Sequence, residues 1–401
     1  MRISSVRVLL LSAPIPPDRR WTSDFGTNTK QDVAIVVVET DAGLTGYGEA
    51  KGTPVVMQAL VEGVLAPQLL GEDPTRVEFL WEKMYSGSRL PLALAHGRPY
   101  HRAGSRGETI HAISGVDVAL WDISGKSLGV PIYRLLGGGV RERLPAYASG
   151  GWAPPELTVD EVLGYREKGF KAVKIRVGGL DEPHFPQRSL ERLRLAREAL
   201  GPDVQLMMDA HGALTVDRAV RLGQTAGELQ LAWFEEPVLA DDDLTGLAEV
   251  RQRVPMPVAT GESETTRFAF RDIVEHRAAD VLQPDVAVVG GLTEARRVAA
   301  LAHAHGLPVA PHVWGSALLW AASLQLAAAT PNCIIFEFCQ AYYPLLYDLL
   351  TTPVTVDPDG YVSVPTGPGL GVELQPESDL LRKYPFDSGT RYTPPGQTAQ
   401  L

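Results

Sequence analysis

The sequence predicts an α/β protein in which a parallel (β/α) barrel carries a smaller α+β domain. Strand-like and helical patterns alternate regularly from Pro145 to about residue 345, which is typical of a parallel sheet. The first fifty residues instead show strands joined by a glycine-rich turn, and the segment after residue 345 is rich in proline and glycine. The 401 residues suffice for one large core and a second, smaller domain.

The N-terminal region predicts a small antiparallel sheet followed by helices. Residues 6–11 and 33–40 are apolar runs of strand length, separated by a polar loop. Residues 54–85 have helical spacing, and in 111–131 apolar residues recur on one helical face before a glycine and a proline end the pattern.

Eight strand-like cores, each bounded by polar residues, glycine or proline, suggest that the parallel sheet closes into a barrel. Between them, Thr158 and Glu161 have the spacing of a capping box, and the helix over 190–200 is expected to end at Gly201. The cores are 145–151, 172–177, 204–210, 231–236, 257–262, 280–286, 307–313 and 333–339.

The amino-acid composition limits the kinds of molecule that the protein is expected to bind. A formal net charge of -11 argues against nucleic acid, which usually requires a basic surface, and favours a small-molecule substrate. Cys333 and Cys339 form neither a zinc ligand set nor a disulfide framework, so a reducing cytoplasm is expected. No apolar run approaches the roughly 20 residues of a membrane span, and no secretory signal is expected at the N-terminus.

Charged residues recur every 23 to 27 residues near the ends of six successive cores, and this interval is about the length of one βα unit. Because the carboxyl ends of barrel strands meet at one mouth, we expect these side chains to converge there. Burying so many like charges without a cation would be prohibitive. The six residues are Asp209, Glu235, Glu262, Asp285, His312 and Glu337.

Asp209, Glu235 and Glu262 predict a magnesium site, because Mg²⁺ prefers hard oxygen ligands. A single Glu at a strand end is more often a cap or a solvated charge, but three in register favour a metal. Glu236 and Glu264 lie beside the proposed ligands. Strand alternation predicts that only one of Glu235 and Glu236 faces inward.

The motifs WFEEP, TGES, LQPD followed by GGLTEA, APH and FEF resemble the successive strand ends of the mandelate racemase subgroup of the enolase superfamily. The segment AISGVDVALWDISGKSLGVPIYRLLGG resembles the helix that leads into its barrel. The resemblance implies a modified TIM barrel, (β/α)7β, and an α+β capping domain made from both termini. The expected division is a capping domain over 1–130, a catalytic barrel over 131–345 and a C-terminal segment, 346–401, packing on the capping domain.

The resemblance also implies residue roles. Asp209, Glu235 and Glu262 would bind Mg²⁺, which stabilises an enediolate. His312 would be the general base, oriented by Asp285, and Glu337 would lie on the opposite side of the substrate carboxylate. Lys174 would bind that carboxylate and add positive charge beside the metal. For His312, a metal ligand or a hydrogen-bonded core histidine is the alternative.

Lys174-Ile-Arg176 departs from the subgroup's usual KxK pattern, in which the second lysine is a base opposite the histidine. An arginine stays protonated, so Arg176 is poorly suited to that role, and two-base racemisation is disfavoured. Arg176 is expected either to bind a substrate carboxylate or hydroxyl, or to form an ion pair with a metal-ligand carboxylate.

His211 stands two residues after Asp209, where many members of the subgroup carry Asn. This DxH motif is similar to that of the galactonate and mannonate dehydratases, in which the histidine is a general acid; the alternative is a structural partner of Asp209. His312 would take the α proton, and either His211 or the newly protonated His312 would protonate the β hydroxyl. The pattern therefore predicts a carbon-oxygen lyase that dehydrates an aldonate or aldarate to a 2-keto-3-deoxy acid. The alternatives are a racemase, epimerase or cycloisomerase on the same scaffold, and a non-catalytic binding protein.

In this superfamily the capping domain confers specificity, so Trp21–Lys30 and Lys51–Thr53 are expected to be lids over the barrel mouth. Members commonly form dimers or octamers, and a homo-oligomer is expected here.

Overall fold

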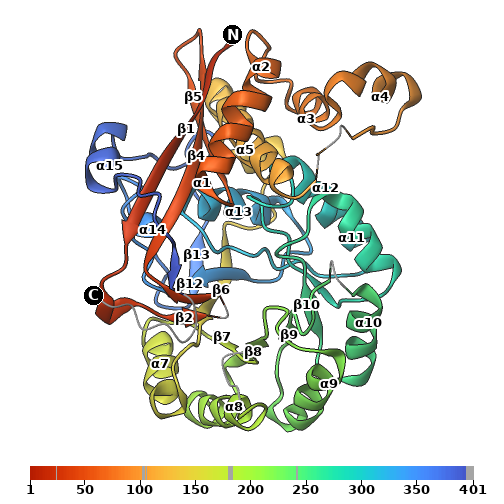
Figure 1. Cartoon of the computed structure of the whole chain (residues 1–401), viewed down its shortest axis with the longest axis vertical. Helices are drawn as coiled ribbons and strands as arrows, with labels where there is room; N and C mark the ends of the chain where they lie inside the picture. The colour runs from red at the N-terminus through yellow and green to blue at the C-terminus, as the bar shows by residue number, and fades with distance from the viewer. Residues whose placement is uncertain (24, 102–103, 105, 179–183, 241–242, 394–401) are drawn as a thin grey trace.

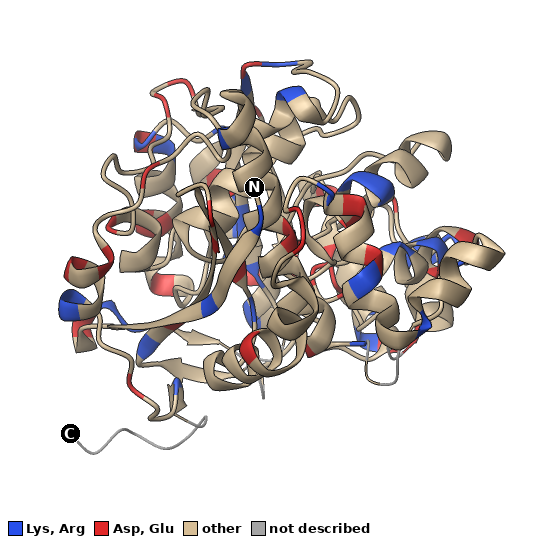
Figure 2. Cartoon of the chain, turned by 90° about the horizontal axis from the view of Figure 1, so that it is seen from above, with Lys and Arg blue, Asp and Glu red and all other residues tan. Residues whose placement is uncertain are grey.

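The architecture combines an N-terminal α+β capping domain with a modified TIM barrel (Figure 1). The computed structural model describes residues 1–23, 25–101, 104, 106–178, 184–240 and 243–393. The N-terminal sheet rises beside its helices above the barrel, whose helices form an outer ring in Figure 1. Lys and Arg are interspersed with Asp and Glu along the helices of both parts (Figure 2).

The capping sheet is antiparallel and has the strand order β1-β4-β5. The long helix α5 packs closely on it, because a Cβ added at Gly48 would lie 2.1 Å from the carbonyl oxygen of Gly115. Glycine at this crossing therefore sets the approach of helix to sheet. The elements are β1 (Ile3–Pro14), β4 (Lys30–Thr40), β5 (Thr45–Ala50), α1 (Pro54–Leu60), α2 (Ala66–Leu69), α3 (Val77–Ser86), α4 (Leu90–His96), α5 (Glu108–Leu128) and α6 (Ile132–Leu135).

The barrel sheet has the strand order β11-β10-β9-β8-β7-β6-β12, with neighbours in the barrel parallel. The predicted seventh strand, 307–313, is reduced to bridges from Val309 to Leu282 and to Cys333, which close the ring. Pro308 and Pro311 remove two backbone donors there, so a longer ladder cannot form. The strands are β6 (Arg143–Gly150), β7 (Ala172–Arg176), β8 (Gln205–Asp209), β9 (Phe234–Glu235), β10 (Val258–Thr260), β11 (Val281–Leu282) and β12 (Phe336–Cys339).

Among the described residues, seven main helices cover the barrel, and α8 ends before Gly201 as predicted. The capping box predicted at Thr158 is wrong, because Pro155 starts α7 three residues earlier. Glu161 instead accepts hydrogen bonds from the backbone of Gly151 and Ala153. The helices are α7 (Pro155–Glu167), α8 (Gln187–Leu200), α9 (Val216–Thr225), α10 (Leu244–Arg253), α11 (Thr266–Glu275), α12 (Gly291–Ala304) and α13 (Ala317–Ala329). No helix in the described part of the chain is long and apolar enough to cross a bilayer.

An apolar layer fills the barrel interior below the polar side chains. Because inward positions alternate along a strand, each polar group stands two residues after a buried apolar one. The pairs are Ala172 and Lys174, Met207 and Asp209, Trp233 and Glu235, Ala310 and His312, and Ile335 and Glu337. The polar side chains therefore stand above this layer, toward the carboxyl ends of the strands.

The C-terminal segment contacts both parts of the molecule. After α14 (Pro344–Tyr347), β13 (Tyr361–Ser363) pairs with β6 of the barrel. Glu377, at the start of α15 (Glu377–Lys383), forms an ion pair of 2.7 Å with Arg7 of β1. Last, β14 (Tyr392–Thr393) joins β3 (Gly26–Asn28) and β2 (Thr22–Ser23) in a small antiparallel sheet.

A buried joint connects α5 to the N-terminus of α12. The carboxylate of Asp117 accepts hydrogen bonds from the backbone N–H of Thr293 at 3.0 Å and from its hydroxyl at 2.6 Å. Ser114 Oγ accepts from the N–H of Gly290 at 2.9 Å. Asp117 and Ser114 of α5 thus accept hydrogen bonds from the backbone donors at the start of α12, where the GGLTEA motif lies.

Replacing Asp117 by Asn should change how stability depends on pH. Burial is the main cause that raises the pKa of Asp117 to about 7. The hydrogen bonds from Thr293 and the charge of Arg297 lower this pKa, whereas the charge of Glu78 raises it. Because the folded pKa exceeds the ordinary value of 3.8, the stability linked to this proton is full below about pH 4 and is lost as pH rises through about 7. Between pH 5 and pH 8, the free energy of unfolding of the wild type should therefore fall by roughly 1–3 kcal/mol more than that of Asp117→Asn. Urea unfolding at the two pH values measures both changes. Equal losses in the two proteins would contradict the assignment.

Candidate active site

A cavity of about 260 Å³ lies at the carboxyl ends of the barrel strands. Three parts of the chain contribute to its wall: the barrel, the N-terminal segments and the end of the described tail. Both predicted lids, Trp21–Lys30 and Lys51–Thr53, supply lining residues. The lining includes Trp21, Phe25, Asn28, Lys51, Trp152, Arg176, His211, Glu262, His312, Trp314, Arg391 and Tyr392.

Asp209, Glu235 and Glu262 come together as predicted. One carboxylate oxygen from each lies within 4.8 Å of the others, and all three side chains are buried. Asp209 and Glu235 end β8 and β9, and Glu262 lies in the turn after β10. Three oxygen donors without a thiol match the ligands that hard divalent cations prefer, so this cluster can hold a metal.

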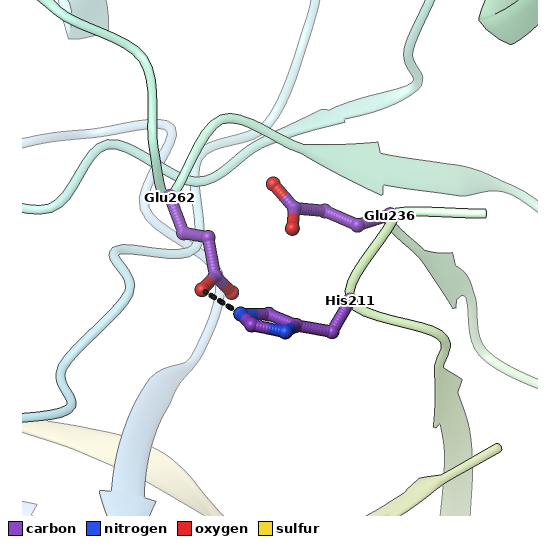
Figure 3. Close-up of side chains that lie close together, drawn as sticks. All are labelled: His211, Glu236 and Glu262. Atoms are coloured by element: carbon purple, nitrogen blue, oxygen red, sulfur yellow. Dashed lines mark ion pairs between the residues drawn. The ribbon is translucent and has the colours of Figure 1, made fainter. Parts of the chain in front are cut away.

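Glu236 also reaches the cluster, so the prediction that only one glutamate of the pair faces inward was wrong. Its carboxylate, the imidazole of His211 and the carboxylate of Glu262 offer ligand atoms within 4.8 Å of one another. In Figure 3 the side chains of His211 and Glu236 point toward that of Glu262. β9 ends at Glu235. Glu236 has a φ of 36°, so the alternation of side chains between the two faces of a strand no longer applies to it.

Lys174 lies at the centre of the carboxylates and is fully buried. Its ammonium is 3.2 Å from Asp209 and 3.0 Å from Glu337, and it also contacts Glu235. Burial raises the pKa of Glu235 to about 7, with Lys174 opposing. Burial alone would also raise the pKa of Glu337, but the positive charges of Lys174 and His312 outweigh burial and lower this pKa to about 2. Lys174 therefore compensates part of the negative charge.

Arg176 forms an ion pair of 2.8 Å with Asp209, the second of the two arrangements that the sequence left open. Its guanidinium also lies 5.7 Å from the ring centroid of Trp152 and lines the cavity. Burial disfavours its charge, but Asp209 together with the neighbouring glutamates outweighs burial and raises the pKa of Arg176 above the ordinary value. Arg176 is thus a fixed cation at this site.

His312 and Asp285 form a buried pair, with His312 Nδ1 2.7 Å from Asp285 Oδ2. The other ring nitrogen, Nε2, lies 3.6 Å from Glu262 and 3.7 Å from Glu337. Since Nδ1 faces a carboxylate, it carries the proton, which leaves Nε2 as the acceptor in the neutral ring. Burial disfavours the charge of Asp285, but Lys51 and His312 lower its pKa below the usual value.

Lys51 was predicted only as part of a lid, yet it contacts this pair directly. Its ammonium lies 2.9 Å from Asp285 Oδ2 and 3.5 Å from His312 Nδ1. The signal was a charged residue directly after the strand 45–50, but its partners lie more than two hundred residues away. The capping domain therefore reaches into the reaction centre.

His211 lies on the same mouth as His312. Its backbone N–H donates to Asp209 at 2.9 Å, and its Nε2 is 3.4 Å from Glu262 Oε1. His312 is nearest the other oxygen, Oε2, so the two imidazoles contact different oxygens of one carboxylate. The φ of 47° at His211 turns its ring away from the strand direction and against the ring of Phe25, with 5.0 Å between the centroids.

Tryptophans form one wall of the cavity, which no motif of the sequence indicates. The ring of Trp152 lies 5.2 Å from Trp314 and 5.7 Å from Trp21. Trp21 was noted as part of a lid, whereas Trp152 and Trp314 follow strand-like cores and carry no distinguishing pattern. Arg391 and Tyr392, from the proline- and glycine-rich tail, were also missed.

Known proteins resemble this chain over nearly its whole length. Residues 9–137 match the mandelate racemase / muconate lactonizing enzyme N-terminal domain, and residues 158–378 match the enolase C-terminal domain-like family. D-galactarolactone cycloisomerase of Agrobacterium fabrum is 36% identical over 96% of this chain and 99% of its own. L-rhamnonate dehydratase of Saccharopolyspora erythraea is 36% identical over 94% of this chain and 91% of its own.

A solved structure agrees with these sequence relatives. A putative mandelate racemase from Bordetella bronchiseptica is 34% identical, with a TM-score of 0.89 over 98% of this chain and 97% of its own. Sequence, fold and the position of the acidic cluster thus lead to one conclusion. This chain belongs to the mandelate racemase subgroup of the enolase superfamily, a group of enzymes that includes acid-sugar dehydratases and a cycloisomerase.

Proposed function

We propose that the chain is a magnesium-dependent dehydratase that converts an aldonate or aldarate to a 2-keto-3-deoxy acid. The observation that carries the proposal is the placement of two imidazoles, His312 and His211, around one carboxylate of the acidic cluster. Such a pair can take one proton from the substrate and give another. The neighbouring basic residues, Lys174 and Arg176, are held by carboxylates instead.

Asp209, Glu235 and Glu262 would hold the magnesium ion. When bound, Mg²⁺ supplies the positive charge that makes a proton beside a carboxylate acidic enough to remove. Lys174 adds a fixed positive charge at the substrate carboxylate, and Glu337 borders its other side. Both are buried, so water does not weaken these interactions.

His312 Nε2 would remove the α proton, while Asp285 holds the ring in the required tautomer and stabilises its protonated form. The C–O bond at the β carbon then breaks, and the leaving hydroxyl takes a proton from His211 to depart as water. The resulting enol gains a proton at carbon 3, loses the proton of its hydroxyl group to solvent and becomes the keto acid. Arg176 stays protonated and therefore cannot act as the second base of a two-base racemase, so racemisation is disfavoured.

A cycloisomerase is the second candidate, because a D-galactarolactone cycloisomerase is among the relatives that match nearly the whole chain. In such a reaction the same base would remove the α proton, but a ring oxygen would leave instead of a hydroxyl. No water would be released, and the product would have the mass of the substrate.

A panel of acid sugars and their lactones, incubated with enzyme and Mg²⁺, tests the proposal. Dehydration predicts a semicarbazide-reactive keto product that is lighter than its substrate by one water. A keto product formed only from lactones, at unchanged mass, would support the cycloisomerase. A hydroxy acid inverted at the α carbon would indicate a racemase.

Replacing His211 by Asn should separate the two proton transfers. Without the general acid, keto product should form about 10²- to 10³-fold more slowly. Exchange of the α proton with deuterated water should continue at close to the wild-type rate, because His312 and Asp285 are unchanged. The measurement is deuterium in recovered substrate, followed by NMR beside product formation.

His276→Asn, at the exposed end of α11, is the matched control and should behave as the wild type. If His211→Asn slows exchange and elimination to the same extent, His211 organises the metal cluster and is not the acid.

A further inference from the structure

The C-terminal tail places Arg391 in the wall of the active-site cavity. The backbone carbonyl of Arg391 accepts hydrogen bonds from the N–H and the hydroxyl of Thr29, both at 3.0 Å. The next residue, Tyr392, pairs with Asn28 in the small sheet formed with the N-terminal lid. Both ends of the chain therefore build this side of the cavity and fix its position.

The guanidinium of Arg391 has hydrogen-bonding capacity that the protein does not use. Its Nη2 donates to the side-chain oxygen of Gln31 at 2.7 Å, whereas its Nε is buried and has no hydrogen-bond partner. Within the described ranges, no carboxylate lies at ion-pair distance from Arg391. A guanidinium with donors that the protein leaves unused is suited to a carboxylate, which accepts charge-assisted hydrogen bonds.

The other cations of this cavity contrast with Arg391. Lys51 is held by Asp285 at 2.9 Å, and Arg176 is held by Asp209 at 2.8 Å. Lys174 is enclosed by three carboxylates. Arg391 thus supplies a positive charge to the cavity that no acidic residue of the described chain compensates by contact.

Arg391 is also separated from the reaction centre by aromatic rings. Phe25 lies 5.0 Å from the His211 ring and 5.4 Å from the Tyr392 ring, and the guanidinium of Arg391 lies 5.0 Å from Tyr392. One region of the cavity therefore combines the metal cluster with Lys174, and another presents Arg391. A metal-binding region and a cationic region, with aromatic side chains between them, complement a molecule that carries an anion at each end.

We infer that Arg391 binds a second carboxylate of the substrate, so that the enzyme acts on aldarates in preference to aldonates. This inference rests on the proposed function, which gives an acid sugar as the substrate. It further identifies the group at the far end of that substrate as a carboxylate. A hydroxymethyl group at that end would leave the partly buried charge of Arg391 without an anion, whereas a carboxylate would neutralise it.

Kinetics with matched aldarate and aldonate pairs of the same configuration test the inference. The wild type should prefer the aldarate. Arg391→Gln should raise KM for the aldarate about 10- to 100-fold, leave its kcat within about threefold and leave the aldonate nearly unchanged. Arg391→Lys should restore part of the affinity. Arg382→Gln, on the exposed face of α15, is the control and should match the wild type.

The inference is overturned if the wild type prefers the aldonate, or if Arg391→Gln impairs both substrates equally. Binding of unreactive acids separates this result from a failure of the proposed function. In the presence of Mg²⁺, adipate should quench tryptophan fluorescence at lower concentration than hexanoate, and Arg391→Gln should remove the difference. If no acid sugar reacts but this difference appears, the dehydratase proposal fails and the role of Arg391 stands. If adipate has no advantage, the role of Arg391 fails whatever the reaction.

Discussion

His312→Asn should abolish exchange of the α proton and reduce keto product formation by at least about 10³-fold. The side chain of Asn can keep a polar contact to Asp285, but it has no basic nitrogen to accept a proton. Substrate binding should change little, because Lys174 and the acidic cluster remain in place. The measurement combines deuterium exchange of the α proton with a direct binding titration.

His303→Asn, near the end of α12, controls for the loss of an imidazole far from the cavity and should retain full activity. Exchange at the wild-type rate in His312→Asn would show that another group removes the proton. Loss of binding together with loss of exchange would show that His312 holds the site together, as a metal ligand would.

Removal of the metal, or of one ligand, should have an effect of similar size. Treatment with a chelator should stop turnover, and added Mg²⁺ should restore it. Mg²⁺ at about 100 times its dissociation constant should stabilise the wild type by about 2.7 kcal/mol, which a thermal melt detects as a higher Tm. Asp209→Asn should lose both the activity and the Mg²⁺-dependent rise in Tm, because a carboxamide is a much weaker ligand for this cation.

Asp203→Asn, in the exposed turn before β8, is the matched control for the loss of one negative charge. Full activity after chelation, or an unchanged Mg²⁺ effect in Asp209→Asn, would contradict the assigned cluster.

Two further variants distinguish the overlapping ligand sets that share Glu262. If Asp209, Glu235 and Glu262 bind the ion, Glu235→Gln should lose the Mg²⁺ effect and Glu236→Gln should keep it. The reverse result would assign the metal to the set that contains His211.

The fold and the centre of the site could be predicted because both depend on a local, repeated pattern. One βα unit places one strand end in the mouth, so the intervals between Asp209, Glu235 and Glu262 already imply that they meet. The same rule fails where a strand ends. Glu236 follows the last residue of β9 at positive φ, and 307–313 lacks the amide donors for a full strand.

The individual contacts of residues from the N-terminal region and the tail could not be predicted, because no interval links these residues to the barrel. Lys51 and Arg391 reach the cavity through the packing of the capping sheet and of the tail, which the sequence pattern does not specify. Asp117 is a similar case, since its role depends on how α5 meets α12. Contacts between distant segments require the three-dimensional structure.

Partial turnover of an acid sugar in deuterated water tests the central claim most directly. Elimination through His312 predicts a 2-keto acid that carries deuterium at carbon 3, formed with release of one water per molecule. A recovered hydroxy acid with deuterium at an inverted α carbon, and no keto product, would contradict the account.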